Sequence, residues 1–156
     1  MEYKTSQYGW VMISIVAGVM LFLYLLYANH WGNNPLPLGP FLSGELLFAI
    51  ILFLFYKLTV VLKGSTLQLV FGIGAIKIQF KIDQLEQTEV IKIPWYYGLG
   101  IRFTPKGMIY SIHGSSALRI KYLSDGTQKS MIIGSPEPEK LNQALRENFK
   151  SDRVKH

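Results

Sequence analysis

Two long apolar segments near the N-terminus constrain this chain more than any other feature. Residues 10–28 are nineteen residues without a charge, and residues 41–57 contain one carboxylate, Glu45, before ending at Lys57. A helix rises about 1.5 Å per residue, so nineteen residues come close to the roughly 30 Å hydrocarbon core of a bilayer. We therefore predict a hairpin of two membrane-spanning helices, at about 10–28 and 41–57.

A cleaved signal peptide is the competing interpretation of the first segment, with Lys4 as its basic region. The apolar stretch is long for a signal peptide, and Leu26-Tyr27-Ala28 is a poor cleavage site. Apolar types make up 49% of the chain and charged types only 17%, whereas a soluble domain has roughly 25% charged residues. These observations favour retained helices and argue against a soluble enzyme.

The distribution of basic residues predicts the orientation of the hairpin. The connecting segment, residues 29–40, contains three prolines, two glycines and no Lys or Arg. Of the 16 Lys and Arg residues, all but Lys4 lie at or beyond Lys57. Because Lys and Arg concentrate on the cytoplasmic side, we predict a multi-pass protein of the bacterial inner membrane with both termini in the cytoplasm.

Within the helices, two features suggest contacts. Ser14, Ala17 and Gly18 form a face of small residues, which we expect to pack against the second helix or, equally, against the helix of a partner. We expect Glu45 to lie near the N-terminal end of its helix at the outer interface, although an intramembrane carboxylate is a functional candidate by default.

Beyond residue 57 the hydrophobic period changes from helical to two. Residues 76–82 alternate apolar and polar side chains without interruption, which is typical of a half-buried strand. Turn signals at residues 63–65, 105–107 and 124–127 separate further short apolar runs. We predict seven or eight antiparallel strands in a domain of residues 58–150, after an N-terminal segment of residues 1–57 that includes the hairpin.

The last element is predicted to be an amphipathic helix. Ser135 is a suitable N-cap, and Pro136 fits the first helical position. Apolar side chains then recur on one helical face, at Leu141, Ala144, Leu145 and Phe149. A basic tail, residues 151–156, is expected to follow.

Three stretches of the sequence, taken with the predicted order of helices and strands, resemble one known family. They are FGIG at Phe71–Gly74, IPWYYGLGIRFTPKGMIYSIHG at Ile93–Gly114 and IIGSPEPEKLNQAL at Ile132–Leu145. With the two helices before them, they look like bacterial membrane-anchored pleckstrin-homology-like (PH-like) proteins, over about residues 58–149. The resemblance implies a membrane α-helical hairpin plus an α+β domain, in which a bent antiparallel β-sandwich or barrel is capped by the C-terminal helix.

The sequence contains no recognisable catalytic constellation. It has no cysteine, and its three histidines are far apart. The glycine pairs at residues 72–74 and 98–100 lack the third glycine of a dinucleotide-binding loop. We therefore predict a non-enzymatic protein without a catalytic, cofactor-binding or metal site, and without a small-molecule substrate. Basic residues are too dispersed to predict nucleic-acid binding.

Aromatic residues suggest a binding surface instead. Trp95, Tyr96 and Tyr97, with Arg102 on the following strand, have the composition of an interface hot spot, although the rings could equally pack as a corner of the domain. We predict that they bind a membrane-protein partner or a second copy of the chain, as in an accessory or assembly subunit. The alternative is a sensor of anionic lipid, which would contact the bilayer through Lys77, Lys81 and Lys92.

Overall fold

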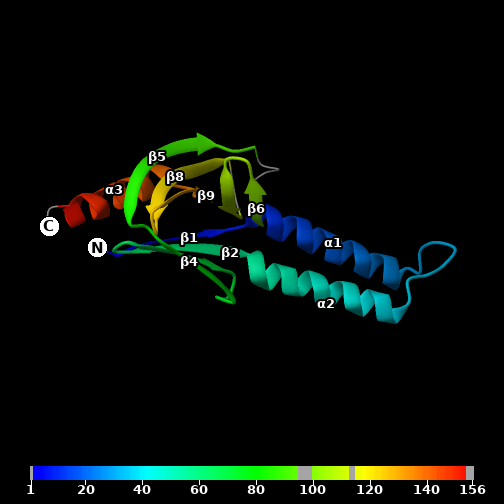
Figure 1. Ribbon diagram of the computed structural model, residues 1–156. Coiled ribbons are helices and arrows are strands. Elements are labelled where there is room, and N and C mark those ends of the chain that lie inside the picture. The colour runs from blue at the N-terminus through cyan, green and yellow to red at the C-terminus, as the bar shows by residue number, and fades with distance from the viewer. Residues whose placement is uncertain (1, 95–99, 113–114, 154–156) are drawn as a thin grey trace.

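A computed structural model describes residues 2–94, 100–112 and 115–153 of the chain. Two long helices, α1 (Trp10–Ala28) and α2 (Leu38–Phe55), lie side by side and extend from one end of a domain built of strands and a C-terminal helix. Figure 1 shows this division, with the helical hairpin on one side and the strands on the other. The hairpin and the α+β character predicted from the sequence are confirmed.

The second helix starts earlier and ends earlier than the predicted range of 41–57. Pro37 is its N-cap, and the N–H of Phe41 donates the first helical hydrogen bond to the Pro37 carbonyl at 3.2 Å. Pro40 therefore occupies the first turn, where a missing N–H leaves no helical bond unmade. The helix ends at Phe55, and Lys57 begins a strand instead of completing a membrane span.

The N-terminal residues form a strand that the sequence analysis did not predict. Strand β1 (Glu2–Tyr8) pairs antiparallel with β2 (Lys57–Lys63) along its whole length. The Gly9 N–H also donates to the Tyr56 carbonyl at 2.9 Å, at the point where both helices meet the sheet. The predicted N-terminal segment of residues 1–57 is therefore not one unit, because residues 2–8 belong to the same β-sheet as the strands that follow α2.

The described strands form two sheets. The first sheet has the order β1-β2-β3-β4, and the second has the order β5-β8-β9-β7-β6. Among the described residues eight strands follow α2, within the predicted seven or eight, namely β2 together with β3 (Thr66–Phe71), β4 (Ile76–Lys81), β5 (Gln84–Lys92), β6 (Gly100–Thr104), β7 (Gly107–Ser111), β8 (Ser116–Ser124) and β9 (Thr127–Gly134).

One pairing contradicts the prediction of a wholly antiparallel arrangement. The hairpins β2–β3, β6–β7 and β8–β9 form at the predicted turns. Strand β9, however, lies between β8 and β7 and runs parallel to β7, with Ile109 opposite Ile132. Strands β7 and β8 follow one another in the chain but are not neighbours in the sheet, so no local turn signal could have predicted this order.

The main core lies between the two sheets and is closed by α3 (Pro138–Arg153). Phe71 and Leu69 from the first sheet meet Leu118 and Ile133 from the second, all fully buried. The predicted apolar face of α3 packs on this core, at Leu141, Ala144, Leu145 and Phe149. Strand β4 contributes Ile76, Ile78 and Phe80, as its alternation predicted.

The ends of α3 differ from the prediction. Pro138, and not Pro136, is the first helical residue, while the Ser135 hydroxyl accepts the Glu137 N–H at 3.2 Å. The helix also continues through residues 151–153, which were assigned to the basic tail. Proline at the first position leaves no helical bond unmade, which explains why the second proline of the pair can start the helix.

Candidate functional site

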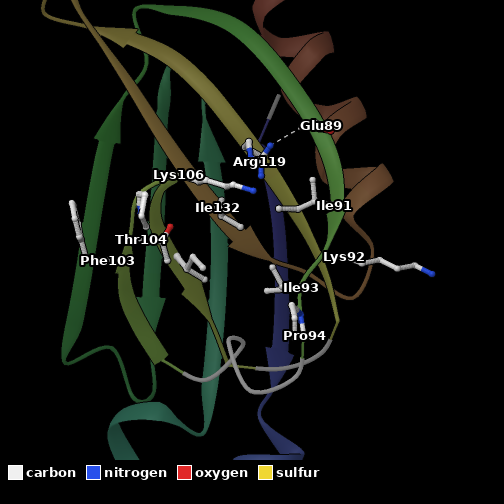
Figure 2. Close-up of a pocket in the computed structure, with 12 residues that line it drawn as sticks. Glu89, Ile91, Lys92, Ile93, Pro94, Phe103, Thr104, Lys106, Arg119 and Ile132 are labelled. Atoms are coloured by element: carbon white, nitrogen blue, oxygen red, sulfur yellow. Dashed lines mark hydrogen bonds and ion pairs between the residues drawn. The ribbon is translucent and has the colours of Figure 1, made fainter.

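One concave feature among the described residues is a hollow on the outer face of the five-stranded sheet, opposite the main core. It has a volume of about 720 Å³ and lies between the C-terminal half of β5 on one side and the β6–β7 hairpin on the other. Figure 2 shows Ile91, Ile93 and Ile132 near its floor, with Arg119 and Lys106 at the rim. We call this feature the hollow.

The floor of the hollow is a second apolar cluster. Ile93, Ile109, Ala117 and Ile132 are all buried, and Ile91 packs against them. Their chain neighbours, including Tyr110, Leu118 and Ile133, face the main core because side chains alternate along a strand. Strands β7, β8 and β9 therefore each place one apolar side chain on the outer face, at Ile109, Ala117 and Ile132.

A sequence signal for this second cluster exists, although the sequence analysis did not use it. Ile109-Tyr110, Ala117-Leu118 and Ile132-Ile133 are adjacent apolar pairs within otherwise alternating strands. A pair of this kind places one apolar side chain on each face of the sheet. Only the three-dimensional arrangement shows that the outer members converge from separate strands.

Charged groups surround this apolar floor. Arg119 donates from Nη1 to Glu89 Oε2 at 3.0 Å across the β5–β8 pair, and the Arg119 side chain is only 22% exposed. The Arg119 Nε is shielded from solvent and has no hydrogen-bond partner within the described ranges. Lys106 lines the hollow with an exposed side chain. The Lys92 side chain points away from the hollow (Figure 2), because it alternates with Ile91 and Ile93 along the chain. The surroundings of the apolar floor thus carry two basic groups and one acidic group.

The predicted partner-binding residues are only partly described. Trp95, Tyr96 and Tyr97 lie outside the described residues, and they follow directly after Pro94, which lines the hollow. Arg102 is exposed on β6, and its register partner is Ile109 of the floor. Since register partners project to the same face of a sheet, Arg102 lies on the face that contains the hollow.

An exposed aromatic side chain near the hollow was missed by the sequence analysis. Phe103 of β6 is 83% exposed. In Figure 2 its ring lies on the far side of β6 from the isoleucines. Its register partner is Met108, which packs against the main core. Phe103 therefore extends past the edge of the core, and it does not form part of the floor of the hollow.

The three lysines predicted to contact lipid do not form one group. Lys77 and Lys81 are exposed on β4 of the first sheet, whereas Lys92 lies at the end of β5 in the second sheet and its side chain points away from the hollow. Lys81 Nζ lies 3.4 Å from an oxygen of Asp83. A headgroup site that uses all three lysines together is therefore not present in this arrangement.

The Asp83 carboxylate also links two connecting segments. Its Oδ2 accepts the backbone N–H of Asp125, in the β8–β9 turn, at 2.8 Å. This hydrogen bond, with further contributions from Lys81 and Lys129, lowers the pKa of Asp83 from its usual 3.8. The carboxylate thus stays ionised while it holds the turn.

The small-residue face of α1 does not pack against α2. Ser14, Ala17 and Gly18 are exposed, and a Cβ placed on Gly18 would meet no atom within 4 Å. The contact between the helices is made elsewhere, with Leu23 Cδ1 lying 3.4 Å from the position of a Cβ on Gly44. The expectation of packing within the hairpin is wrong, and the alternative, a partner's helix, stays a prediction.

Glu45 lies deeper in its helix than predicted. Because α2 begins at Leu38, Glu45 is seven residues into the helix, or about 10 Å along its axis. Its Oε1 is shielded from solvent and has no hydrogen-bond partner among the described residues. The carboxylate is therefore not at the helix end, where the helix dipole would stabilise it.

Both helices have the length and apolarity of membrane spans. Of the most apolar 18 residues, 6% are buried within the protein in α1 and 0% in α2, so neither helix is the core helix of a globular domain.

Among the described residues, no three His, Asp or Glu side chains are grouped so that they could hold a metal ion. The geometry at the hollow suits binding of a chain or ligand with apolar and acidic groups.

The structure thus defines a class of protein in which an exposed apolar helical hairpin is joined to a two-sheet α+β domain. Comparison with protein-family models, with curated proteins and with solved structures finds no match to this chain.

Proposed function

We propose that this chain is a non-enzymatic integral membrane protein whose two-sheet domain binds a protein partner through the hollow. The helical hairpin anchors it in the bacterial inner membrane with both termini cytoplasmic, as the distribution of Lys and Arg predicts. The domain serves as a PH-like module of an accessory or assembly subunit. Pairing of β1 with β2 supports one part of this topology, because it places the N-terminal strand and the rest of the domain at the same end of the hairpin.

The observation that carries the proposal is the second apolar cluster beneath the hollow. A sheet that needed only one core would place polar side chains on its outer face. Here Ile109 and Ile132 occupy that face instead, and they lie at the bottom of an open concavity. Concave sites with an apolar floor and a few polar groups at the rim are the usual form of a binding site.

The rim indicates the chemistry of the partner. Lys106 and Arg119 outnumber Glu89 around the hollow, and the Arg119 Nε is a donor without a partner within the described ranges. A partner segment with apolar side chains for the floor and carboxylates for the rim fits this arrangement. Trp95, Tyr96, Tyr97 and Arg102 extend the proposed contact, since the aromatic run follows Pro94 and Arg102 lies on the same face.

Sensing of anionic lipid is the less favoured alternative. It predicts separate contacts of Lys77, Lys81 and Lys92 with anionic lipid, and these side chains lie on two different sheets, so they do not form one lipid-facing patch. Binding of a protein partner needs only the groups around the hollow.

The test is co-purification of membrane proteins with the full chain in mild detergent. We expect the substitution Lys106→Glu to abolish capture of a partner that the unchanged chain retains, because it reverses the charge at the rim. The Lys106 side chain is exposed, so folding should be unaffected. The matched control is Lys150→Glu, an equivalent charge change on α3, which packs on the core side of the sheet.

Two results would contradict the proposal. One is equal capture by Lys106→Glu and the unchanged chain. The other is equal loss in Lys106→Glu and in Lys150→Glu, since this would indicate a general effect of charge and not an effect of the hollow.

A further inference from the structure

The turn between β3 and β4, residues 72–75, packs against the last turn of α2. Gly72 has φ +56°, and its N–H donates to the Lys57 carbonyl at 2.7 Å. A Cβ placed on Gly72 would lie 2.1 Å from the Phe53 carbonyl oxygen and 2.6 Å from that of Leu54. The turn can approach the helix so closely only because residue 72 has no side chain. Figure 1 shows the turn beside the domain end of α2.

This contact places the β3–β4 turn at the depth of apolar helix residues. Phe53 and Leu54 belong to the candidate span of α2, and Phe53 is itself exposed. Ile73, next to Gly72, is 69% exposed although it is a large apolar residue. An exposed isoleucine in a tight turn is not explained by the main core, which contains its neighbour Phe71.

The side chains at the domain ends of α1 and α2 are of the types that concentrate at membrane interfaces. The Tyr8 ring lies 6.3 Å from the rings of both Trp10 and Tyr56, measured between centroids. Lys57 Nζ lies 5.3 Å above the Tyr8 ring. Tyrosine, tryptophan and lysine concentrate where hydrocarbon gives way to headgroups. They therefore mark the headgroup level at the domain ends of α1 and α2.

A basic side chain accompanies the exposed isoleucine. Lys77 is exposed on β4, and its Cε lies 3.7 Å from the position that a Cβ on Gly74 would take. Lys77 thus lies over the β3–β4 turn, on the side of the strand that does not face the main core. An apolar side chain together with a cation is the combination that binds the interface of an anionic bilayer.

We propose that the β3–β4 turn is a third membrane contact, in which Ile73 enters the interfacial layer of the bilayer and Lys77 pairs with anionic headgroups. The proposal rests on the proposed spanning of the membrane by α1 and α2. Two helices joined to one pair of strands would still allow the domain to tilt about the hairpin. A contact beside α2 resists this tilt and holds the hollow in a constant orientation relative to the bilayer.

The test uses the full chain carrying one environment-sensitive fluorophore. Because the sequence has no cysteine, a single introduced cysteine is labelled uniquely. The reporter is Ile73→Cys, in vesicles of equal parts phosphatidylcholine and phosphatidylglycerol. The matched control is Phe103→Cys, an exposed apolar position on the other sheet. A third variant, Leu46→Cys, reports on the middle of α2, where the side chain is 63% exposed.

We expect the label at residue 73 to have blue-shifted emission and to be quenched several-fold more by nitroxide-bearing lipids than by aqueous iodide. The label at residue 103 should show the reverse preference. If residue 73 behaves like residue 103 while residue 46 is protected from iodide, the third contact is refuted and the membrane spans are retained. If the label at residue 46 is also quenched by iodide, the spanning hairpin fails, and the third contact fails with it.

Discussion

Replacement of Gly72 by alanine tests the contact between the β3–β4 turn and α2 directly. The left-handed backbone of residue 72 costs any residue with a Cβ roughly 1–2 kcal/mol. The added methyl group would also lie 2.1 Å from the Phe53 carbonyl oxygen, so the turn must move away from the helix. That movement breaks the hydrogen bond from Gly72 N–H to the Lys57 carbonyl, which contributes about 1 kcal/mol. We therefore expect a total destabilisation of about 2–3 kcal/mol.

Gly64→Ala provides a matched control in the same protein. Gly64 has φ +54°, almost the same as Gly72, but a Cβ there would meet no atom within 4 Å. It should therefore show only the backbone cost of roughly 1–2 kcal/mol. The difference between the two variants isolates the contact with α2.

The assay is thermal unfolding of the full chain and both variants in the same detergent. For a protein of this size, 1 kcal/mol corresponds to about 2–4 °C in Tm. We expect the Tm of Gly72→Ala to lie at least about 2 °C below that of Gly64→Ala. Equal Tm values would refute the reasoning, since they would mean that the turn does not depend on its close approach to the helix.

Two further predictions concern hydrogen bonds between distant segments. Gln7 of β1 donates from Nε2 to the Gly134 carbonyl at 2.6 Å in a buried position. Gln7→Ala should therefore lower the free energy of unfolding, measured in urea, by about 1–3 kcal/mol. An unchanged urea midpoint would contradict this. The pKa of Asp83 is lowered from 3.8 because its carboxylate accepts the Asp125 N–H. The ionised carboxylate therefore stabilises the folded protein at neutral pH, and this contribution is lost as pH falls through the lowered pKa. Asp83→Asn should therefore have a lower Tm than the unchanged chain at pH 7, with the difference disappearing in acid; a constant difference would contradict this.

Local patterns in the sequence predicted the elements whose formation depends on near neighbours. The alternation of residues 76–82 correctly assigned Ile76, Ile78 and Phe80 to the core face of β4. The helical spacing of Leu141 and Leu145 likewise predicted the buried face of α3. In both cases burial follows from periodicity, because a strand or helix presents its side chains at fixed intervals.

The candidate site was predictable only in part. Arg102 was expected to belong to a binding surface, and the structure places it on the face of the hollow. Ile109 and Ile132, which form the floor, looked like ordinary core residues in the sequence. Lys77 and Lys92 seemed equivalent as basic residues on strands, yet they lie on different sheets. Sheet order decides which outward-facing side chains meet, and no local pattern encodes it.

The apolar length of the two helices and the periods of the strands were therefore determined by the sequence alone. Only the tertiary structure decided that residues 2–8 form a strand, since EYKTSQY has no apolar alternation and depends on pairing with β2. It also decided that β9 lies parallel to β7 and that Gly72 lies against α2. These features join residues far apart in the chain, and their stability comes from hydrogen bonds and packing that exist only after the segments have met.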